Sequence, residues 1–442
     1  MTVVASKVEN DALKQKVDDQ TCPRPRSSRI NTALSAVVCL LAAVGFAVVT
    51  NRYDDSQDEA IVAMLRWLEA NGIQIDGMEI VEDGFGGRDI RSTRPIREGE
   101  VLAGMPQGMM LGRDYCQNNS AVQAVYQLAP EMSSNEQLAI CLLANMDGSS
   151  FWTPFINVLP KSIPLPIFWD EEDLLWLEVP HFIQHILETR ESLQRTYESV
   201  QQISPKVTLQ EYMHAWAIVA SRAWGFNIEG EVQERLVPLF DLANHEPNGI
   251  MVSFNEDDIS AQLVANRDYE FGAPIHTFYS NHSNFILLHG YGFTLENNDE
   301  HMTCSVDDGE NIWQLNRNMG ESSEFQQFME KHRVASVTDH NNVLDHEILA
   351  LEQLYLAIET AETGSTTIEE DETLLQDKSL SMNQRNAVRA RRHEKLCWKS
   401  FKNLAQTLTE IMYDSKKWAW FEAKFEDWAG FEDYAQHIFS IL

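Results

Sequence analysis

The spacing of hydrophobic positions changes several times along the chain, and each spacing predicts a different kind of element. Within residues 58–71, four apolar side chains recur at helical intervals, at Ile61, Met64, Leu65 and Leu68. Gly72 suits the C-terminal cap of that helix. Short apolar runs separated by Gly and Pro then predict small strands at 78–82, 89–93 and 101–106. The strand pattern returns later, at residues 237–240, 251–255, 261–264 and 275–279.

Helices are predicted between and after these two groups of strands. Ser133 with Glu136, and Thr208 with Glu211, have the spacing of a capping box before apolar runs. Residues 168–200 between them read as helical, as does most of the last third of the chain. A polar, acidic stretch at 363–381 is interpreted as a loop or linker. The predicted order is short strands, a helical insertion, more short strands and a helical tail.

An apolar stretch near the N-terminus raises the question of a membrane. Residues 30–51 are 22 consecutive uncharged positions, and about 20 suffice to cross a bilayer. Three arginines precede the stretch and acidic residues follow it, so the charge bias places residues 1–29 in the cytosol. We expect a single transmembrane helix here. A cleaved targeting segment and a buried core helix are the alternatives.

Composition excludes several classes of function. The chain has 442 residues with a formal net charge of −33, from 34 Lys and Arg against 67 Asp and Glu. Such a charge repels a polyphosphate backbone, which argues against nucleic-acid binding. Six cysteines occur without any CxxC pair. We therefore expect neither a disulfide scaffold nor a cysteine-rich zinc module.

Three segments carry candidate chemistry, and each also has a plainer interpretation. The glycine-rich loop 83–88, with Phe85 and Gly86, can let a ligand approach the backbone or be an ordinary turn. Residues 237–245 end in polar groups that can face a ligand or form an Asx turn, at Asp241, Asn244 and His245. Tyr279 and Tyr291 flank an apolar segment and can line a channel or belong to the core.

Other constellations carry less weight. His181 and His185 have the i, i+4 spacing of zinc ligands, but the stretch lacks the Glu of HExxH and an evident third ligand, so we expect a surface pair. No GxSxG occurs, which removes support for a hydrolase nucleophile. No metal site is predicted.

The order of the segments resembles a known family. EDGFGGRDIRSTRPIREGEVLAGMPQGMML resembles the opening of a SET domain, VPLFDLANH its asparagine–histidine segment and TFYSNHSNFILLHGYGF its closing tyrosine segment. The segments WTPFINVLP, PIFW and SRAWGF are similar to the helical insertion of the Rubisco large-subunit methyltransferase-like branch. NQRNAVRARRHEKL resembles the helical substrate-binding domain of that branch.

The resemblance implies an α+β SET fold of short curled sheets with pseudoknot-like threading at residues 58–300. A helical insertion falls at about 112–225, and an α-helical substrate-binding-like domain at 301–442. It also implies S-adenosylmethionine as cofactor and Tyr279 as the catalytic tyrosine, with Tyr291 lining the substrate channel. The implied cofactor-binding residues are Phe85, Gly86, Arg222, Asp241, Asn244, His245 and Phe293.

The function expected from this resemblance is methylation of a lysine side chain on a non-histone protein. Alternatives are methylation of histidine by the same fold, or a membrane-tethered peptide-binding module without turnover. Methyl transfer from a sulfonium needs a neutral amine, alignment and charge stabilisation, which agrees with the lack of a metal cluster or nucleophile triad. Ser280 replaces the usual Gly after the catalytic tyrosine, and Gly272-Ala273-Pro274 replaces a Gly-Glu pair.

The expected partners are a protein substrate and, through the N-terminal segment, a membrane; the oligomeric state is left open. Because S-adenosylmethionine is made in the cytosol and the cysteines show no pairing pattern, we expect the catalytic region to face a reducing compartment. The alternative location is a plastid, after cleavage of the N-terminal segment.

Overall fold

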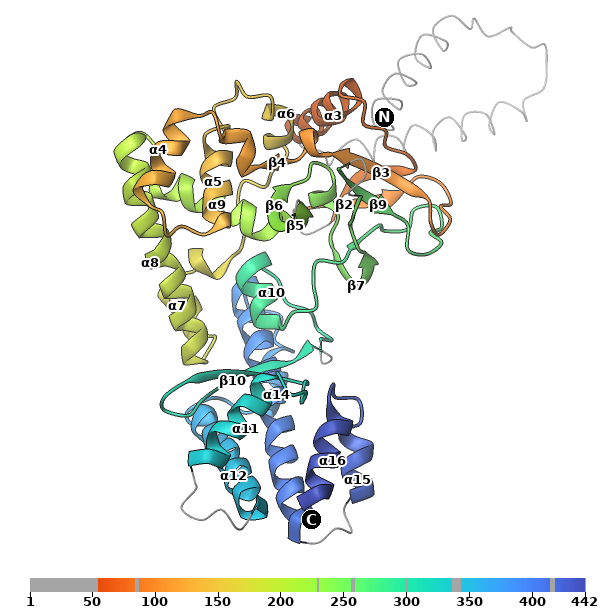
Figure 1. The fold of residues 1–442 in the computed structure, drawn as a ribbon. Coiled ribbons are helices and arrows are strands. Elements are labelled where there is room, and N and C mark those ends of the chain that lie inside the picture. Colours follow the sequence, from red (N-terminus) through yellow and green to blue (C-terminus); the bar gives the residue numbers. More distant parts are fainter. Residues whose placement is uncertain are drawn as a thin grey trace, which may run out of the picture. The chain divides into compact units, whose positions relative to one another are not determined.

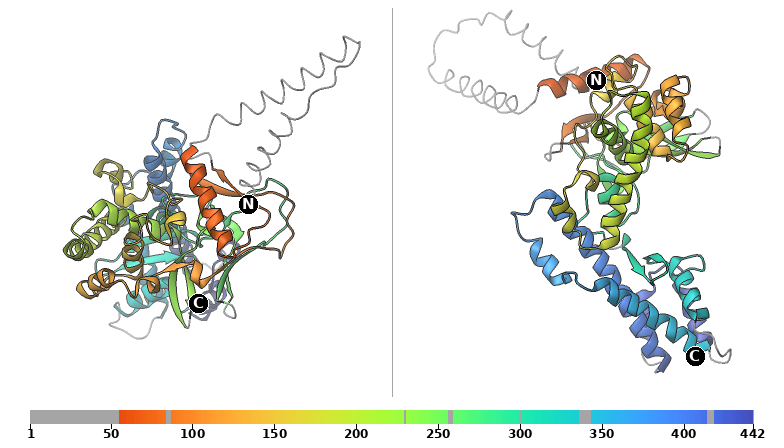
Figure 2. Two further views of the ribbon diagram at one scale, coloured as in Figure 1. Left: turned by 90° about the horizontal axis from the view of Figure 1, so that it is seen from above. Right: turned by 90° about the vertical axis from the view of Figure 1, so that its left-hand side faces the viewer.

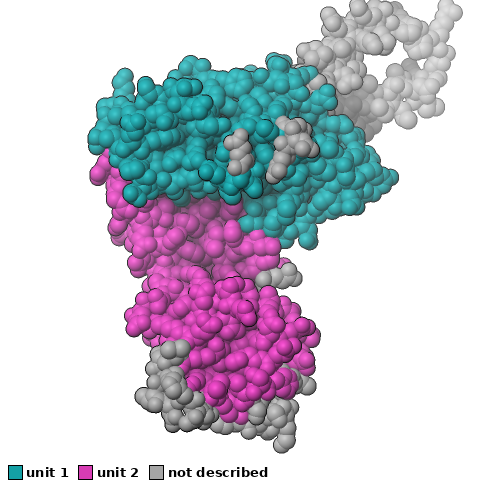
Figure 3. All heavy atoms as spheres, in the orientation of Figure 1, with its two compact units in different colours: residues 1–161, 199–280 teal, residues 162–198, 281–442 magenta. Residues whose placement is uncertain are grey.

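The computed structural model describes residues 55–83, 87–228, 230–255, 259–298, 301–335, 343–413 and 418–441. Two compact units share these residues (Figure 3). Unit 1 comprises residues 1–161 and 199–280, and unit 2 comprises residues 162–198 and 281–442. Three predictions fall outside the described residues, namely the apolar stretch 30–51 and the site residues Phe85 and Gly86.

Unit 1 combines short strands with a group of helices (Figure 1). Its helices are α3 (Asp55–Ala70), α4 (Ser120–Leu128), α5 (Ser134–Leu143), α6 (Thr153–Ile156) and α9 (Leu209–Arg222), with the 3₁₀ turns η1 (Gln107–Met109), η2 (Arg113–Cys116) and η4 (Phe240–Leu242). Its strands are β1 (Met78–Glu82), β2 (Arg88–Ser92), β3 (Val101–Pro106), β4 (Leu111–Gly112), β5 (Ala223–Ile228), β6 (Glu231–Leu236), β7 (His245–Ile250), β8 (Ser253–Asn255) and β9 (Ser260–Val264).

The strands of unit 1 other than β7 form three small antiparallel sheets, with the orders β1-β2, β3-β9-β8 and β4-β6-β5, and β7 makes isolated bridges to Thr277. Strand β3 pairs with β9, which lies about 160 positions later in the chain, with Gly104 opposite Gln262. The predictions for strands 78–82 and 101–106 are confirmed, and both capping boxes form as predicted. Pairing over such separations joins the two groups of strands that flank the helices.

The predicted strand at 237–240 is wrong, because the chain turns there into η4. Leu239 has φ 75°, a left-handed backbone conformation, and Pro238 before it cannot donate a ladder hydrogen bond. The side chain of Leu239 is nevertheless fully packed in the core. The chain therefore changes direction at Leu239, and Asp241 and the residues after it do not continue the line of a strand.

Residues 276–278 thread between two parts of one segment. On one side, the N–H of Thr277 donates to the carbonyl of Asn244 at 2.9 Å. On the other side, the N–H of Phe278 donates to the carbonyl of Ile250, and the N–H of Ile250 donates to the carbonyl of His276, both at 2.8 Å. A Cβ at Gly249 would lie 2.5 Å from the carbonyl carbon of Thr277, so only glycine permits this close passage.

Unit 2 is largely helical. Its elements are η3 (Pro166–Phe168), α7 (Glu171–Leu175), α8 (Pro180–Ile203, of which 199–203 belong to unit 1), α10 (Asn284–Tyr291), β10 (Thr303–Asp307), β11 (Ile312–Asn316), α11 (Glu324–Ala335), α12 (Val343–Glu362), α13 (Ile368–Leu374), α14 (Met382–Tyr413), α15 (Trp418–Phe425) and α16 (Phe431–Ile441). Strands β10 and β11 form an antiparallel pair. The long helix α14 packs against α12 (Figure 1), and Figure 2 shows the same ribbon from two further directions.

The loop predicted at 363–381 is wrong in part, because α13 forms inside it. Thr367 and Glu370 make a complete capping box at the start of α13. Asp371 on this helix is fully buried and accepts hydrogen bonds from Arg391 and Lys395 of α14. The spacing Thr367-x-x-Glu370 is the local signal for this helix, and it lies within a stretch whose acidic composition favours a loop.

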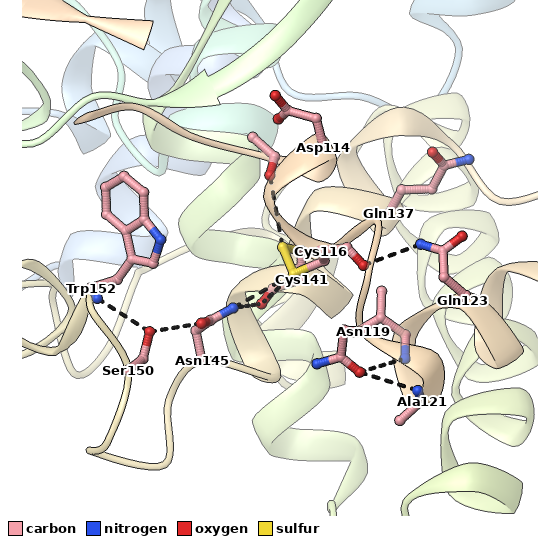
Figure 4. The surroundings of a disulfide bond; sticks show 12 residues. Asp114, Cys116, Asn119, Ala121, Gln123, Gln137, Cys141, Asn145, Ser150 and Trp152 are labelled. Atoms are coloured by element: carbon pink, nitrogen blue, oxygen red, sulfur yellow. Dashed lines mark hydrogen bonds between the residues drawn. A yellow bond between two sulfur atoms is a disulfide. The ribbon is translucent and has the colours of Figure 1, made fainter. Parts of the chain in front are cut away.

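Four cysteines form two disulfide bonds, which corrects the expectation of unpaired cysteines. Cys116 on η2 bonds Cys141 on α5, and Cys304 on β10 bonds Cys397 on α14. Figure 4 shows the first bond, beside which Asn145 donates to the carbonyl of Cys141 at 2.8 Å. Because the partners are 25 and 93 positions apart, local spacing in the sequence does not reveal them.

The prediction of a membrane anchor is also corrected. Among the described helices, none combines the length and the apolar composition that a bilayer crossing requires. The longest of them carry charged residues along their length, as α14 does with four arginines between positions 385 and 392. The single-pass anchor, the membrane as a partner and the localisation derived from that anchor are therefore not supported by the structure, and residues 30–51 themselves lie outside the described residues.

Candidate active site

Arg222 and Asp241 form the charged part of the site in unit 1. Arg222 is the last residue of α9, and its Nη1 donates to the backbone carbonyl of Asp241. The same Nη1 lies 3.8 Å from Oδ2 of Asp241. The Arg222 side chain is 25% exposed, whereas that of Asp241 is 0% exposed. The buried Asp241 thus contacts Arg222 through its backbone carbonyl and its carboxylate, while part of the Arg222 side chain stays exposed.

Burial changes the acidity of Asp241. Loss of water around the carboxyl raises its pKa to about 6, although the positive charge of Arg222 acts in the opposite direction. Neither carboxylate oxygen accepts a hydrogen bond within the described residues. The group is therefore close to the pH at which it changes charge, and its charge state sets how strongly it holds Arg222.

Asn244, His245 and Tyr279 converge at the threaded segment. The backbone N–H of Tyr279 donates to Nδ1 of His245 at 3.1 Å, and their rings are 5.2 Å apart. The hydroxyl of Tyr279 donates to the carbonyl of Ala243 at 2.8 Å. Asn244 follows Ala243 and is half-buried, and its side-chain amide makes no hydrogen bond within the described residues. The Tyr279 hydroxyl, the Ala243 carbonyl and the His245 ring, which come from two distant segments, thus lie close together.

An aromatic wall and a buried hydroxyl complete this region. Trp224 on β5 meets the ring of Tyr279 edge to face, with centroids 6.1 Å apart. Ser280, where the resembled family has Gly, has a buried hydroxyl that makes no hydrogen bond within the described residues. Trp224 is not among the site residues predicted from the sequence, although it lies only two positions after Arg222.

Two further predicted site residues belong to unit 2. The rings of Tyr291 and Phe293 lie 6.2 Å apart at the end of α10. Between them Gly292 has φ 82°, and a Cβ there would lie 3.0 Å from Cγ of Pro164. Glycine is thus required for the turn that separates the two rings.

The histidine pair predicted on the surface is only partly exposed. His185 is exposed and its ring lies 4.6 Å from that of His289 on α10. Burial lowers the pKa of His181 to about 4, and Nε2 of this ring lies 3.6 Å from Oε1 of Glu394. Among the described residues no three His, Cys, Asp or Glu side chains lie where they could hold a metal ion.

The polar groups of unit 1 suit a ligand that carries both carboxylate and amino groups. Nε of Arg222 is buried and makes no hydrogen bond within the described residues, and a guanidinium binds a carboxylate through two N–H groups. The Asn244 amide offers both donors and an acceptor. S-adenosylmethionine has such an amino-acid end, so the residues present fit the cofactor that the sequence resemblance implies.

Comparisons with known proteins agree with the architecture. Residues 314–396 match the family model described as Rubisco LSMT substrate-binding. The fold matches the crystal structure of the SET domain of LSMT bound to lysine and AdoHcy with a TM-score of 0.67, at 18% identity over 80% of this chain and 92% of that one.

Curated relatives match a part of the sequence. The actin-histidine N-methyltransferase of Rhinolophus ferrumequinum is 27% identical over 266 residues, which cover 56% of this chain and 44% of that protein. The protein of the same name from Xenopus tropicalis is 28% identical over 282 residues, or 58% and 46% of the two chains. The chain therefore spans less than half the length of these relatives. The chain thus shares the fold of the SET domain of LSMT, matches the Rubisco LSMT substrate-binding model in its C-terminal part, and is similar in part of its sequence to the actin-histidine N-methyltransferases.

Proposed function

We propose that the chain is an S-adenosylmethionine-dependent protein N-methyltransferase and that its acceptor is a histidine side chain. The observation that carries the proposal is the convergence, in unit 1, of Tyr279 with His245 and Ala243. Arg222 and the buried Asp241 supply a charged pair in the same unit. The names of the relatives support the histidine acceptor in preference to the lysine expected from the sequence.

Each site residue has a role in this proposal. When bound, S-adenosylmethionine supplies a methyl group on an electrophilic sulfonium. Arg222 binds its carboxylate, and the buried Asp241 holds Arg222 in place. Asn244 and His245 bind the rest of its amino-acid end. The roles of Phe85, Gly86 and Phe293 toward the cofactor, and of Tyr291 toward the substrate, stay predictions from the sequence resemblance.

Tyr279 orients the reacting groups. Its hydroxyl donates to the carbonyl of Ala243, so the direction of that O–H is fixed before any substrate binds. The His245 nitrogen holds the backbone of Tyr279 at the same time. A preorganised phenol of this kind aligns an acceptor nitrogen and stabilises developing charge without reorganising.

The protonation state of the acceptor favours histidine. An unperturbed imidazole has a pKa of about 6.5, so at neutral pH most of it is uncharged and one nitrogen carries a free lone pair. An unperturbed lysine has a pKa of about 10.4 and must first lose a proton. Methylation of histidine therefore requires only that the imidazole has the correct tautomer and orientation, which hydrogen-bonding groups such as the Asn244 amide can set.

Lysine is the second candidate, because the site has an aromatic wall. The edge-to-face contact of Trp224 with Tyr279 presents a surface on which methylene groups pack and an ammonium binds through cation–π attraction. A solved protein of the same fold was crystallised with lysine. Trp224→Asn tests this candidate, since removing the aromatic surface should weaken lysine methylation more than histidine methylation.

The test is a transfer assay with the full chain and labelled S-adenosylmethionine. Actin is the first protein substrate to try, because it is the one named for the relatives, and a cell extract is the second. Mass spectrometry of the labelled protein should find the added methyl on a histidine. If the methyl group is found on a lysine, lysine replaces histidine as the proposed acceptor. If neither actin nor the cell extract is labelled, the proposed enzymatic function is wrong.

Cofactor binding provides a separate readout. Arg222→Ala and Asn244→Ala should each abolish binding of S-adenosylhomocysteine in calorimetry. Arg97→Ala is the matched control, because Arg97 is exposed in unit 1 and pairs with Asp268 at 2.6 Å. A chain that binds this product without transferring label would be a binding module without turnover, the remaining alternative.

A further inference from the structure

Unit 2 contains a cavity of about 410 Å³ that none of the roles above uses. Helix α14 forms one wall, the C-terminal end of α13 a second, and residues 295–297 after α10 a third. Three arginines of α14 line it, Arg385, Arg389 and Arg392, and we call it the Arg389 cavity. Their spacing of four and three positions places them on one face of the helix.

The three guanidinium groups differ in how they are neutralised. Arg392 pairs with Glu372, with Nη2 to Oε1 at 2.7 Å. Arg385 donates to the carbonyls of Leu375 and Asp377, at 2.8 and 2.7 Å, so two of its N–H groups are bound but its charge has no carboxylate partner among the described residues. Arg389 is half-buried and makes no hydrogen bond or ion pair in the part of the chain that the structure describes.

Acidic groups at the cavity do not account for this excess of positive charge. Glu372 already pairs with Arg392, and Glu296, the other acidic lining residue, is exposed and pairs with none of the described residues. The chain as a whole carries a net charge of −33. Keeping an unpaired guanidinium half-buried costs free energy unless a partner neutralises it, because burial disfavours a charge that lacks a counter-charge.

We propose that the Arg389 cavity binds a carboxylate side chain on an acidic segment of a protein partner. A guanidinium matches a carboxylate through two parallel N–H groups, and Arg389 has these groups available. The volume suits one or two side chains, which a peptide segment can insert. That the partner is the methylation substrate rests on the proposed function; that the cavity binds carboxylate does not.

The family match of this part of the chain favours a protein as the occupant of the Arg389 cavity. Arg385, Arg389 and Arg392 all lie within residues 314–396, which match the Rubisco LSMT substrate-binding family. A phosphate group is the competing anion. We favour carboxylate because Arg389 is the one guanidinium in the cavity without a partner among the described residues, while the neighbouring Arg385 is bound to carbonyls. A doubly charged phosphate usually binds to several free cations.

The experiment measures binding without cofactor or catalysis. A fluorescent peptide of alternating Asp and Glu is titrated with the full chain, beside an Asn/Gln peptide of equal length and a phosphoserine peptide. The acidic peptide should bind, added salt should weaken it, and Arg389→Gln should lower its affinity at least about tenfold. Lys399→Gln is the matched control, because Lys399 is exposed on the same helix and outside the cavity.

Equal binding of the Asn/Gln peptide, or unchanged affinity in Arg389→Gln, would overturn the proposal. Tighter binding of the phosphoserine peptide would replace carboxylate by phosphate as the ligand. With an active enzyme, Arg389→Gln should raise KM for the protein substrate and leave kcat unchanged. If the chain transfers no methyl group but binds the acidic peptide through Arg389, the proposed function fails and this inference stands.

Discussion

The backbone N–H of Tyr279 donates to Nδ1 of His245 over 3.1 Å, which joins two segments that lie 34 positions apart in the chain. The bond is possible because residues 276–278 thread between Asn244 and Ile250. Since Nδ1 accepts the Tyr279 N–H, a proton on the neutral His245 ring resides on Nε2. The threading therefore sets both the position of the tyrosine and the tautomer of the histidine.

Tyr279→Phe removes the hydroxyl that donates to Ala243 and keeps the ring. We expect methyl transfer to fall about 100-fold, because a preorganised polar group near the reacting atoms is lost. Binding of S-adenosylhomocysteine should persist, and the free energy of unfolding should drop by only about 1 kcal/mol. Turnover assays and calorimetry measure the two effects.

Tyr269→Phe is the control for that variant. Its hydroxyl donates to Asn266 at 2.7 Å, a contact within unit 1 that takes no part in the proposed site. The control should keep full turnover. Equal turnover in both variants would remove Tyr279 from its proposed role.

Asp241 makes the stability of unit 1 depend on pH. Burial raises its pKa from 3.8 to about 6, so the folded protein binds this proton more tightly than the unfolded chain does. The resulting stabilisation is complete below about pH 4 and is lost as the pH rises through 6, a change of about 3 kcal/mol. Asp241→Asn stays neutral, so its Tm relative to that of the original chain should rise between pH 4 and pH 7.

Asp268→Asn is expected to change the pH dependence of stability in the opposite direction to Asp241→Asn. Asp268 is exposed, and hydrogen bonds from the Glu98 N–H and from Arg97 lower its pKa. Removing its charge should therefore cost stability above pH 4 and not below. Thermal unfolding across this pH range checks both variants, and a pH-independent difference for Asp241→Asn would disprove the raised pKa.

Glu347 should make unit 2 sensitive to acid. Its side chain is 1% exposed, yet bonds from His437, Arg333 and Tyr434 outweigh the effect of burial and lower its pKa from 4.5 to about 2. Its stabilisation is present above pH 4.5 and disappears as the pH falls through 2, about 3 kcal/mol in all. Glu347→Gln should abolish this acid sensitivity and destabilise unit 2 at pH 7.

Hydrogen exchange of α12 and α16 measures the effect of Glu347→Gln locally. Glu352→Gln is the control, because Glu352 lies on the same helix α12 and is exposed. Faster exchange in the control, or no change in Glu347→Gln, would show that the buried carboxylate does not stabilise the contact between these helices.

The two disulfide bonds should protect four cysteines from alkylation. In the unreduced chain, mass spectrometry should find Cys116, Cys141, Cys304 and Cys397 unmodified and linked in the two pairs that the structure has. Replacing both members of either pair by Ser should lower the free energy of unfolding by about 3 to 5 kcal/mol, because each bond closes a long loop. Alkylation of all four without reductant would contradict these bonds.

Local signals in the sequence determined much of the secondary structure. The capping boxes at Ser133 and Thr208, and the strands 78–82 and 101–106, follow from residues within a few positions of one another. Such interactions depend on side-chain chemistry and spacing alone, so they can be read without the fold. The third capping box, at Thr367, has the same local origin.

Only the tertiary structure decided which distant groups meet. The contact of Arg222 with Asp241, the two disulfides and the threading of residues 276–278 all join positions that local patterns cannot connect. The left-handed backbone at Leu239 is another such outcome, because packing of its side chain in the core imposes a conformation that local preference disfavours. Energies summed over many long-range contacts outweigh local propensity there, which is why the sequence named the candidate residues but not the geometry that joins them.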